Sequence, residues 1–137
     1  MLKAERGFTL IELITVVVLI SVLSVTLFSR MGSIASAKVQ ASRDDLIAAL
    51  FFAQQTAMAR SGISLVITSG AVDVKENGTS LKIDNKSYPL NFTGGVTATA
   101  ATFNYDKLGR TTTAVISLNG SDGASASVTV EASGYAH

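Results

Sequence analysis

Hydrophobic and polar residues divide the chain into two unlike parts. From Leu13 to Ser29 there is no charged side chain, and a helix formed by this segment would be apolar on every face. The stretch from Phe8 to Phe28 holds no Gly or Pro. A hydrocarbon core of about 30 Å needs about 20 helical residues, and in lipid the backbone must satisfy its own hydrogen bonds. The pattern therefore predicts a transmembrane helix over residues 8–29.

After this run the pattern becomes amphipathic. No Pro interrupts residues 30–60, and Ser61-Gly62 provides a stop signal, so we predict one continuous helix from about Phe8 to about Arg60. We interpret Gly32 as tolerated within the helix, where it lowers helix stability by about 1 kcal/mol relative to Ala. The second half of the helix is expected to lay one apolar face on a β domain. That face consists of Ile34, Val39, Leu46, Leu50, Ala53 and Ala57.

From Ile63 onward the apolar residues alternate with a period of two, which predicts strands. Asn77-Gly78 is a strong hairpin signal, and Pro89 indicates an edge position or a strand end. We expect six or seven strands, mostly antiparallel, curled around the helix. This is an α+β fold in which a long N-terminal helix packs on a small antiparallel β domain. The expected strands are 63–69, 72–75, 81–84, 88–92, 96–105, 114–119 and 126–131.

Composition and net charge exclude several classes of function. The chain has 137 residues and a formal net charge of +1, so no global field attracts nucleic acid or acidic membranes. Removing residues 1–7 takes away Lys3, Arg6 and Glu5 and leaves nine basic and nine acidic residues from the original 11 and 10. The absence of Cys excludes disulfides, thiolate catalysis and Cys-based zinc sites.

Two alternatives compete with an assembly role for the N-terminal segment. A secretory signal peptide would close its apolar run with a small-residue cleavage site, but residues 28–31 read Phe-Ser-Arg-Met. A plain single-pass anchor leaves Glu12 unexplained, because a carboxylate at the bilayer centre costs about 2.5–3.5 kcal/mol and less near the interface. An ionisable residue in a membrane helix indicates a functional site, so Glu12 is a candidate.

Residues 6–13 read Arg-Gly-Phe-Thr-Leu-Ile-Glu-Leu, after a short basic leader and before the apolar run. This segment resembles the signal of type IV pilins and type II secretion pseudopilins. The resemblance implies that a prepilin peptidase cleaves between Gly7 and Phe8 and methylates the new amino terminus of Phe8. It also implies that the Glu12 carboxylate pairs with the Phe8 amine of a neighbouring subunit. Such a pair would offset the penalty of two unpaired charges in lipid and fix the axial stagger between helices.

The resemblance also implies a domain organisation and a location. Residues 1–7 would be the leader peptide, 8–29 the transmembrane and assembly helix, 30–60 its amphipathic continuation and 61–137 the β-rich domain. Lys3 and Arg6 before the span, against Arg30 after it, favour a cytoplasmic N-terminus. We expect a single pass through the bacterial inner membrane, a periplasmic β domain and later incorporation into a filament. The expected partners are other pilin or pseudopilin subunits, the prepilin peptidase and the inner-membrane assembly platform.

A second resemblance lies in the C-terminal half. Residues 102–110 read Thr-Phe-Asn-Tyr-Asp-Lys-Leu-Gly-Arg, and two strands and Ser133-Gly134-Tyr135 follow. This arrangement resembles the GspH/FimT-like minor pseudopilins and the MshC-like minor pilins of mannose-sensitive haemagglutinin pili. Major type IV pilins usually close a C-terminal loop with a disulfide, which this chain cannot form. The resemblance thus implies a minor subunit of a type IV pilus or of a type II secretion pseudopilus.

Candidate chemistry elsewhere is sparse, and we expect neither an enzyme nor a cofactor or metal site. The single His, His137, is the last residue and is expected to be mobile. Some FimT-like pilins take up DNA, which makes Lys107 and Arg110 the candidate ligand residues. Two or three cations give only weak, salt-sensitive phosphate contacts, so we do not expect nucleic acid as a partner. The alternative function is a DNA-uptake or adhesive ligand-binding subunit. If Lys107 and Arg110 bind no ligand, we expect them to pair with Asp106 or to contact the next subunit.

Overall fold

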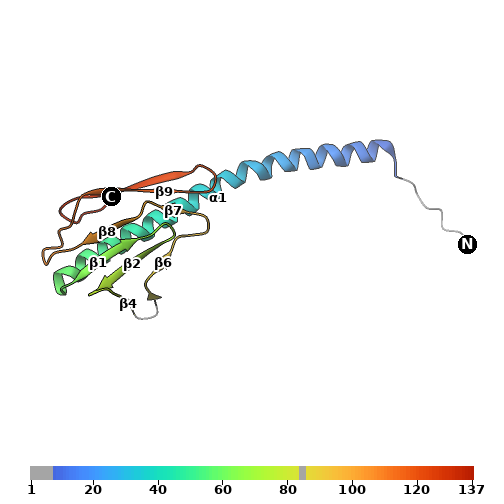
Figure 1. The fold of residues 1–137 in the computed structure, drawn as a ribbon. Coiled ribbons are helices and arrows are strands. Elements are labelled where there is room, and N and C mark those ends of the chain that lie inside the picture. The colour runs from blue at the N-terminus through green and yellow to red at the C-terminus, as the bar shows by residue number, and fades with distance from the viewer. Residues whose placement is uncertain (1–7, 84–85) are drawn as a thin grey trace, which may run out of the picture. The chain divides into compact units, whose positions relative to one another are not determined.

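The computed structural model describes residues 8–83 and 86–137 (Figure 1). The chain divides into two compact units, with the boundary between Ile34 and Ala35. A single helix, α1 (Leu10–Ala59), contributes to both units. The predicted continuous helix is thus present, and it runs through Gly32 without interruption. It ends before Gly62, whose positive φ of 75° is a conformation that Gly adopts more readily than other residues.

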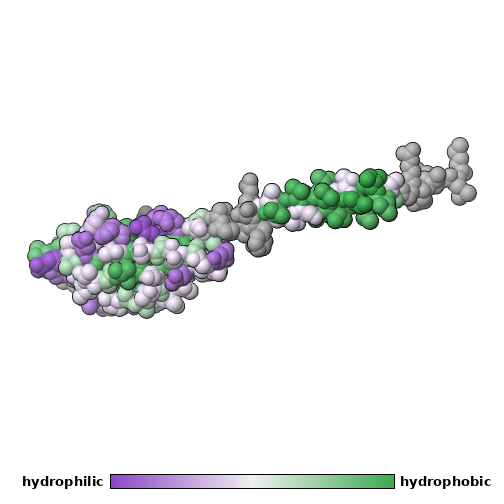
Figure 2. Space-filling view, turned by 90° about the horizontal axis from the view of Figure 1, so that it is seen from above, coloured by the Kyte–Doolittle hydropathy of each residue, from purple (hydrophilic) through white to green (hydrophobic). Residues whose placement is uncertain are grey.

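In the first unit, the apolar side chains of α1 from Leu10 to Leu27 are exposed. The segment Leu10–Leu27 has a mean hydropathy of 2.6, and none of it is buried. Figure 2 shows hydrophobic side chains along this part of the helix. By length and composition the segment can cross a membrane.

In the second unit, one face of α1 enters the hydrophobic core. Five of the six predicted stripe residues are buried, but Ile34 is 54% exposed. The expectation for Ile34 was wrong because the buried face of the helix begins one residue later, at Ala35. The confirmed members are Val39, Leu46, Leu50, Ala53 and Ala57.

Two main sheets contribute to this core, together with a short two-stranded ladder. A five-stranded antiparallel sheet has the order β3-β2-β1-β8, with β6 also paired to β2; its strands are β1 (Ile63–Ile67), β2 (Ala71–Glu76), β3 (Thr79–Ser80), β6 (Leu90–Asn91) and β8 (Ala101–Asn104). A three-stranded sheet has the order β10-β9-β7, from β7 (Thr97–Ala98), β9 (Ala114–Asn119) and β10 (Ser125–Val130). The ladder joins β4 (Lys82–Ile83) and β5 (Lys86–Ser87).

Alternating burial along the strands gives one core. Every second residue of β1 is buried, and β9 and β10 likewise direct Ile116, Leu118, Val128 and Val130 inward. These residues join the buried face of α1 in one hydrophobic cluster. Figure 1 shows the strands gathered along the second half of α1. The predicted α+β class, with a helix packed on an antiparallel β domain, is confirmed.

The hairpin prediction is also confirmed, whereas one predicted strand is wrong. Asn77 and Gly78 connect β2 to β3 with φ values of 50° and 83°, as a two-residue turn of type I′ requires. Residues 96–105 form two strands in different sheets, because the chain leaves β9 after Ala98 and joins β1 at Ala101. The described residues contain ten strands rather than six or seven, since five of them have only two residues. Asp84, in the predicted strand 81–84, lies outside the described residues.

Candidate functional site

The first candidate site is the N-terminal end of α1. Gly7 lies outside the described residues, and the Phe8 side chain is 73% exposed. Thr9 caps the helix: its carbonyl accepts hydrogen bonds from the Glu12 and Leu13 amides, and its Oγ1 lies 3.3 Å from the Glu12 nitrogen. Glu12 is the acidic residue of the first turn, where the helix dipole favours a negative charge.

This cap was not anticipated from the sequence. Thr9 and Glu12 have the Thr-x-x-Glu spacing of a capping box, which is a recognisable signal for a helix start. In a complete capping box the Glu side chain would also accept a hydrogen bond from the Thr9 amide, but among the described residues the Glu12 carboxylate makes no such bond. Only the Thr9 half of the box is formed, and it caps the Glu12 amide.

The hydroxyl groups of the apolar segment are all satisfied within the helix. Each of the four bonds to a backbone carbonyl three or four residues earlier, at 2.7–2.8 Å. By contrast, among the described residues the Glu12 carboxylate has no hydrogen-bond or ion-pair partner. Glu12 is thus the one side chain between Leu10 and Leu27 whose polar group lacks a hydrogen-bond or ion-pair partner. The four hydroxyl residues are Thr15, Ser21, Ser24 and Thr26.

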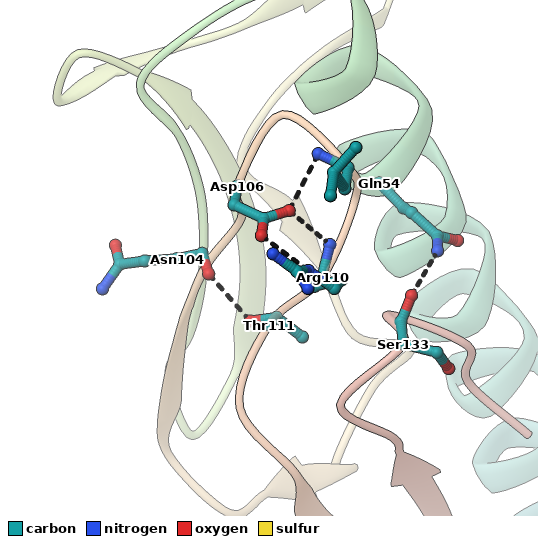
Figure 3. Close-up of polar contacts among 7 residues, drawn as sticks. Gln54, Asn104, Asp106, Arg110, Thr111 and Ser133 are labelled. Carbon is teal, nitrogen blue, oxygen red and sulfur yellow. Dashed lines mark hydrogen bonds and ion pairs between the residues drawn. The ribbon is translucent and has the colours of Figure 1, made fainter.

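The second candidate site is the loop at residues 106–110, which follows β8. Asp106 organises it: Oδ1 accepts hydrogen bonds from the Leu108 and Arg110 amides at 2.8 and 2.9 Å (Figure 3). Oδ2 accepts a hydrogen bond from Arg110 Nε at 2.8 Å. The Arg110 amide, followed by this side-chain contact and the Leu108 amide, holds the pKa of Asp106 below its usual range. The loop therefore keeps its shape as long as Asp106 is ionised.

The two cations proposed for ligand binding have different surroundings. Arg110 is paired with Asp106, whereas Lys107 is exposed and makes no ion pair within the described part of the chain. Tyr105, which directly precedes the loop, is buried, and burial raises its pKa to about 12. Tyr135 is 60% exposed and stacks on His137 with ring centroids 5.4 Å apart. The structure thus brings no cluster of free cations together in the residues it describes.

Gln54 of α1 joins this loop to the C-terminal turn. Gln54 Nε2 donates a hydrogen bond to the Ser133 carbonyl at 3.0 Å, as Figure 3 shows. A Cβ at Gly109 would lie 2.9 Å from Gln54 Cγ, and a Cβ at Gly134 would collide with the Gly109 carbonyl. The segments 102–110 and 133–135, which carry the second sequence resemblance, therefore meet at one side chain of the helix.

The chain end is held rather than mobile. The amide of His137 donates to the Thr129 carbonyl, and the amide of Thr129 donates to the His137 carbonyl, at 3.0 and 2.8 Å. The expectation of a mobile C-terminus was wrong because these bonds extend the edge of β10. His137 still has no acidic neighbour in an ion pair, and the described residues contain no group of three potential metal ligands.

Comparison with known proteins identifies the N-terminal segment. Residues 2–28 match the family model described as the prokaryotic N-terminal methylation motif. No curated protein and no solved structure matches the chain. The matched segment includes Gly7, Phe8, Glu12 and the apolar run. The motif supports the pilin and pseudopilin superfamily and indicates a type IV pilin-like protein that is processed as a prepilin. The motif and the apolar helix together fit anchoring in a membrane.

Proposed function

We propose that this chain is a minor pilin or pseudopilin subunit. A prepilin peptidase cleaves it between Gly7 and Phe8 and methylates Phe8. The subunit crosses the inner membrane once, with its N-terminus cytoplasmic and its β domain periplasmic, and then enters a type IV pilus or a type II secretion pseudopilus. The match of residues 2–28 to the methylation motif carries this proposal.

The polar groups of the N-terminal segment support an assembly role for Glu12. The four hydroxyl side chains are satisfied inside their own helix, so they offer no strong polar contact to a neighbour. A free carboxylate in lipid is costly, and an amine brought against it removes much of that cost. We propose that the methylated amine of Phe8 from a neighbouring subunit pairs with Glu12 and sets the stagger between helices.

The sequence resemblance of residues 102–110 and 133–135 is the support for placing the chain among minor subunits like the GspH/FimT-like and MshC-like proteins. A chain without Cys needs another way to fix its C-terminal segment. Here the hydrogen bond from Gln54 to Ser133 and the contact of Gly134 with Gly109 provide it. The alternative, a DNA-uptake or adhesive subunit, depends on Lys107, since Arg110 is engaged by Asp106.

Processing is tested by mass spectrometry of the full-length chain expressed with and without a prepilin peptidase. We expect a peptidase-dependent loss of residues 1–7 and the gain of one methyl group on Phe8. A chain that keeps residues 1–7 in the presence of an active peptidase would contradict the proposal. Cleavage after Phe28 would instead identify a secreted β domain.

The role of Glu12 is tested with two substitutions that separate charge from side-chain size. Glu12→Gln keeps the size and polarity of the side chain but removes the charge, whereas Glu12→Asp keeps the charge. We expect Glu12→Gln to be cleaved normally but to lower the amount of subunit in the filament fraction by more than about tenfold, since losing one partner of a buried ion pair is strongly destabilising. Wild-type incorporation of the Gln variant would contradict the intersubunit pair.

A further inference from the structure

An apolar groove runs along the outer face of the second half of α1. Asp44, Ile47, Ala48 and Phe51 have the spacing of one helix face, and Tyr135 of the C-terminal turn forms the opposite wall. The groove has a volume of about 370 Å³. Phe51 and Tyr135 are 57% and 60% exposed, so the rest of the chain leaves it open. An apolar surface of this kind, bordered by polar residues, is typical of a protein interface.

One end of the groove is acidic. The Asp44 side chain is 69% exposed, and its contact with Arg43 Nη1 is long, at 4.0 Å. Arg43 is also held elsewhere, because its Nε donates a hydrogen bond to the Ser127 carbonyl at 3.1 Å. Asp44 is therefore available to a second cation. An occupant that fits the groove combines an apolar side chain with an adjacent positive charge.

The same chain presents that combination at the tip of the 106–110 loop. Leu108 is 67% exposed, and the neighbouring Lys107 has no ion-pair partner among the described residues. Asp106 fixes the loop on either side of the tip, because its carboxylate accepts hydrogen bonds from the Leu108 and Arg110 amides. Gly109 packs against Gln54, yet Leu108 of the same chain stays exposed and does not fill the groove. The tip is thus preorganised for contact with another molecule, which lowers the entropy lost on binding.

We propose that the Lys107-Leu108 tip of one copy docks in the α1 groove of a second copy. Leu108 enters between Ile47, Phe51 and Tyr135, and Lys107 Nζ pairs with the Asp44 carboxylate. This inference rests on the proposed function, because two copies must enter the same filament to make the contact. The tip and the groove are different surfaces of the subunit, so the same contact repeats from one copy to the next. It sets the register between β domains, while the N-terminal helices supply most of the buried apolar area.

The absence of Cys makes site-specific crosslinking a direct test. Two differently tagged full-length chains, one with Ala48→Cys and one with Leu108→Cys, are expressed together with a prepilin peptidase and an assembly platform. We expect oxidation to give a mixed dimer at about tenfold the yield of a control pair, because docked thiols have a high effective concentration. The control pairs Ala48→Cys with Val115→Cys on β9, whose native side chain is 59% exposed. Equal yields in the two pairs would overturn the proposed contact.

Charge exchange tests the pairing of Lys107 with Asp44. Lys107→Glu in the Leu108→Cys chain should lower the crosslink yield by about two- to fivefold, the range of an exposed ion pair. Asp44→Lys in the other chain should restore it, and Lys82→Glu serves as the matched control. Failure of the restoration would overturn the pairing.

The same samples separate this inference from the proposed function. The mass of each chain reports cleavage after Gly7 independently of the crosslink. Cleaved chains without a specific crosslink overturn the docking contact alone. Chains that are never cleaved overturn the proposed function and the contact that rests on it.

Discussion

Gln54 is the residue at which two turns distant in sequence meet. It donates a hydrogen bond to the Ser133 carbonyl and lies against Gly109 and Gly134. Both glycines have positive φ values, 73° and 84°, and neither has room for a side chain. Backbone conformation and close packing therefore require glycine independently at this junction.

Two glycine substitutions separate these requirements. Gly134→Ala combines a φ of 84° with a collision against the Gly109 carbonyl, and we expect it to destabilise the chain by about 3 kcal/mol or more. Gly123→Ala has a φ of 78° but open space around its Cβ, so it should cost only about 1–2 kcal/mol. Denaturant unfolding of the detergent-solubilised chain, followed by circular dichroism, measures both. Equal losses would mean that the junction adjusts to the extra carbon.

Asp106 makes the 106–110 loop sensitive to acid. Its pKa is lower in the folded protein than in the unfolded chain, chiefly because the Arg110 amide donates to its carboxylate. Its contribution is therefore fully present above the unfolded pKa of about 3.9 and is lost as the pH falls through the lower folded pKa. We expect the unfolding midpoint of Asp106→Asn to fall less steeply with acid than that of the wild type. Parallel pH profiles for the two proteins would contradict this assignment.

At the scale of elements, α1 is tied to the β domain by a polar contact as well as by its apolar face. Ser42 is completely buried, and its Oγ accepts a hydrogen bond from the Thr93 amide at 3.1 Å. We expect Ser42→Ala to destabilise the chain by about 1–2 kcal/mol, because the amide loses its partner. Ser125→Ala, at an exposed position of β10, is the control and should change stability by less than about 0.5 kcal/mol. Urea unfolding measures both, and a neutral Ser42→Ala would show that water replaces the hydroxyl.

The long periodic elements were predictable because each of them has one clear pattern in the sequence. Continuous apolarity and then a stripe of buried residues define α1, and an Asn-Gly turn fixes the β2–β3 hairpin. The split of residues 96–105 was missed because no Gly or Pro marks the change of sheet. Its one sequence signal is the pair Ala100-Ala101, where the alternation shifts phase: Val96 and Ala98 are buried before it, and Phe103 and Tyr105 after it. Two-residue strands such as β4 and β6 are too short to form a pattern.

The candidate sites were predictable only where a local motif carries them. Gly7, Phe8 and Glu12 lie in a contiguous signal, although the cap formed by Thr9 was overlooked. The meeting of the 106–110 loop with the C-terminal turn depends on tertiary packing around Gln54, which no spacing reveals. Likewise, the pairing of Arg110 with Asp106 was one of several possibilities until the loop geometry selected it.

For the molecule as a whole, the core lies in the second unit. Among the described residues every buried side chain belongs to the range 35–137, and none comes from the apolar segment before it. We expect a fragment of residues 35–137 to remain soluble without detergent and to unfold cooperatively. Its unfolding midpoint should lie within about 5 °C of that of the full chain, measured by circular dichroism. A fragment without cooperative unfolding would show that the first unit stabilises the second.

The internal hydroxyl bonds of α1 have a mechanical consequence for the proposed filament. Thr15, Ser21, Ser24 and Thr26 are bonded to their own helix, so the lateral surface of the segment offers mainly nondirectional contacts. Neighbouring helices with such surfaces can slide past one another under tension without breaking a series of specific bonds. Resistance to stretching would then depend on the few charged contacts at the helix start. A filament built in this way extends readily under load and recovers its length when the charges meet again.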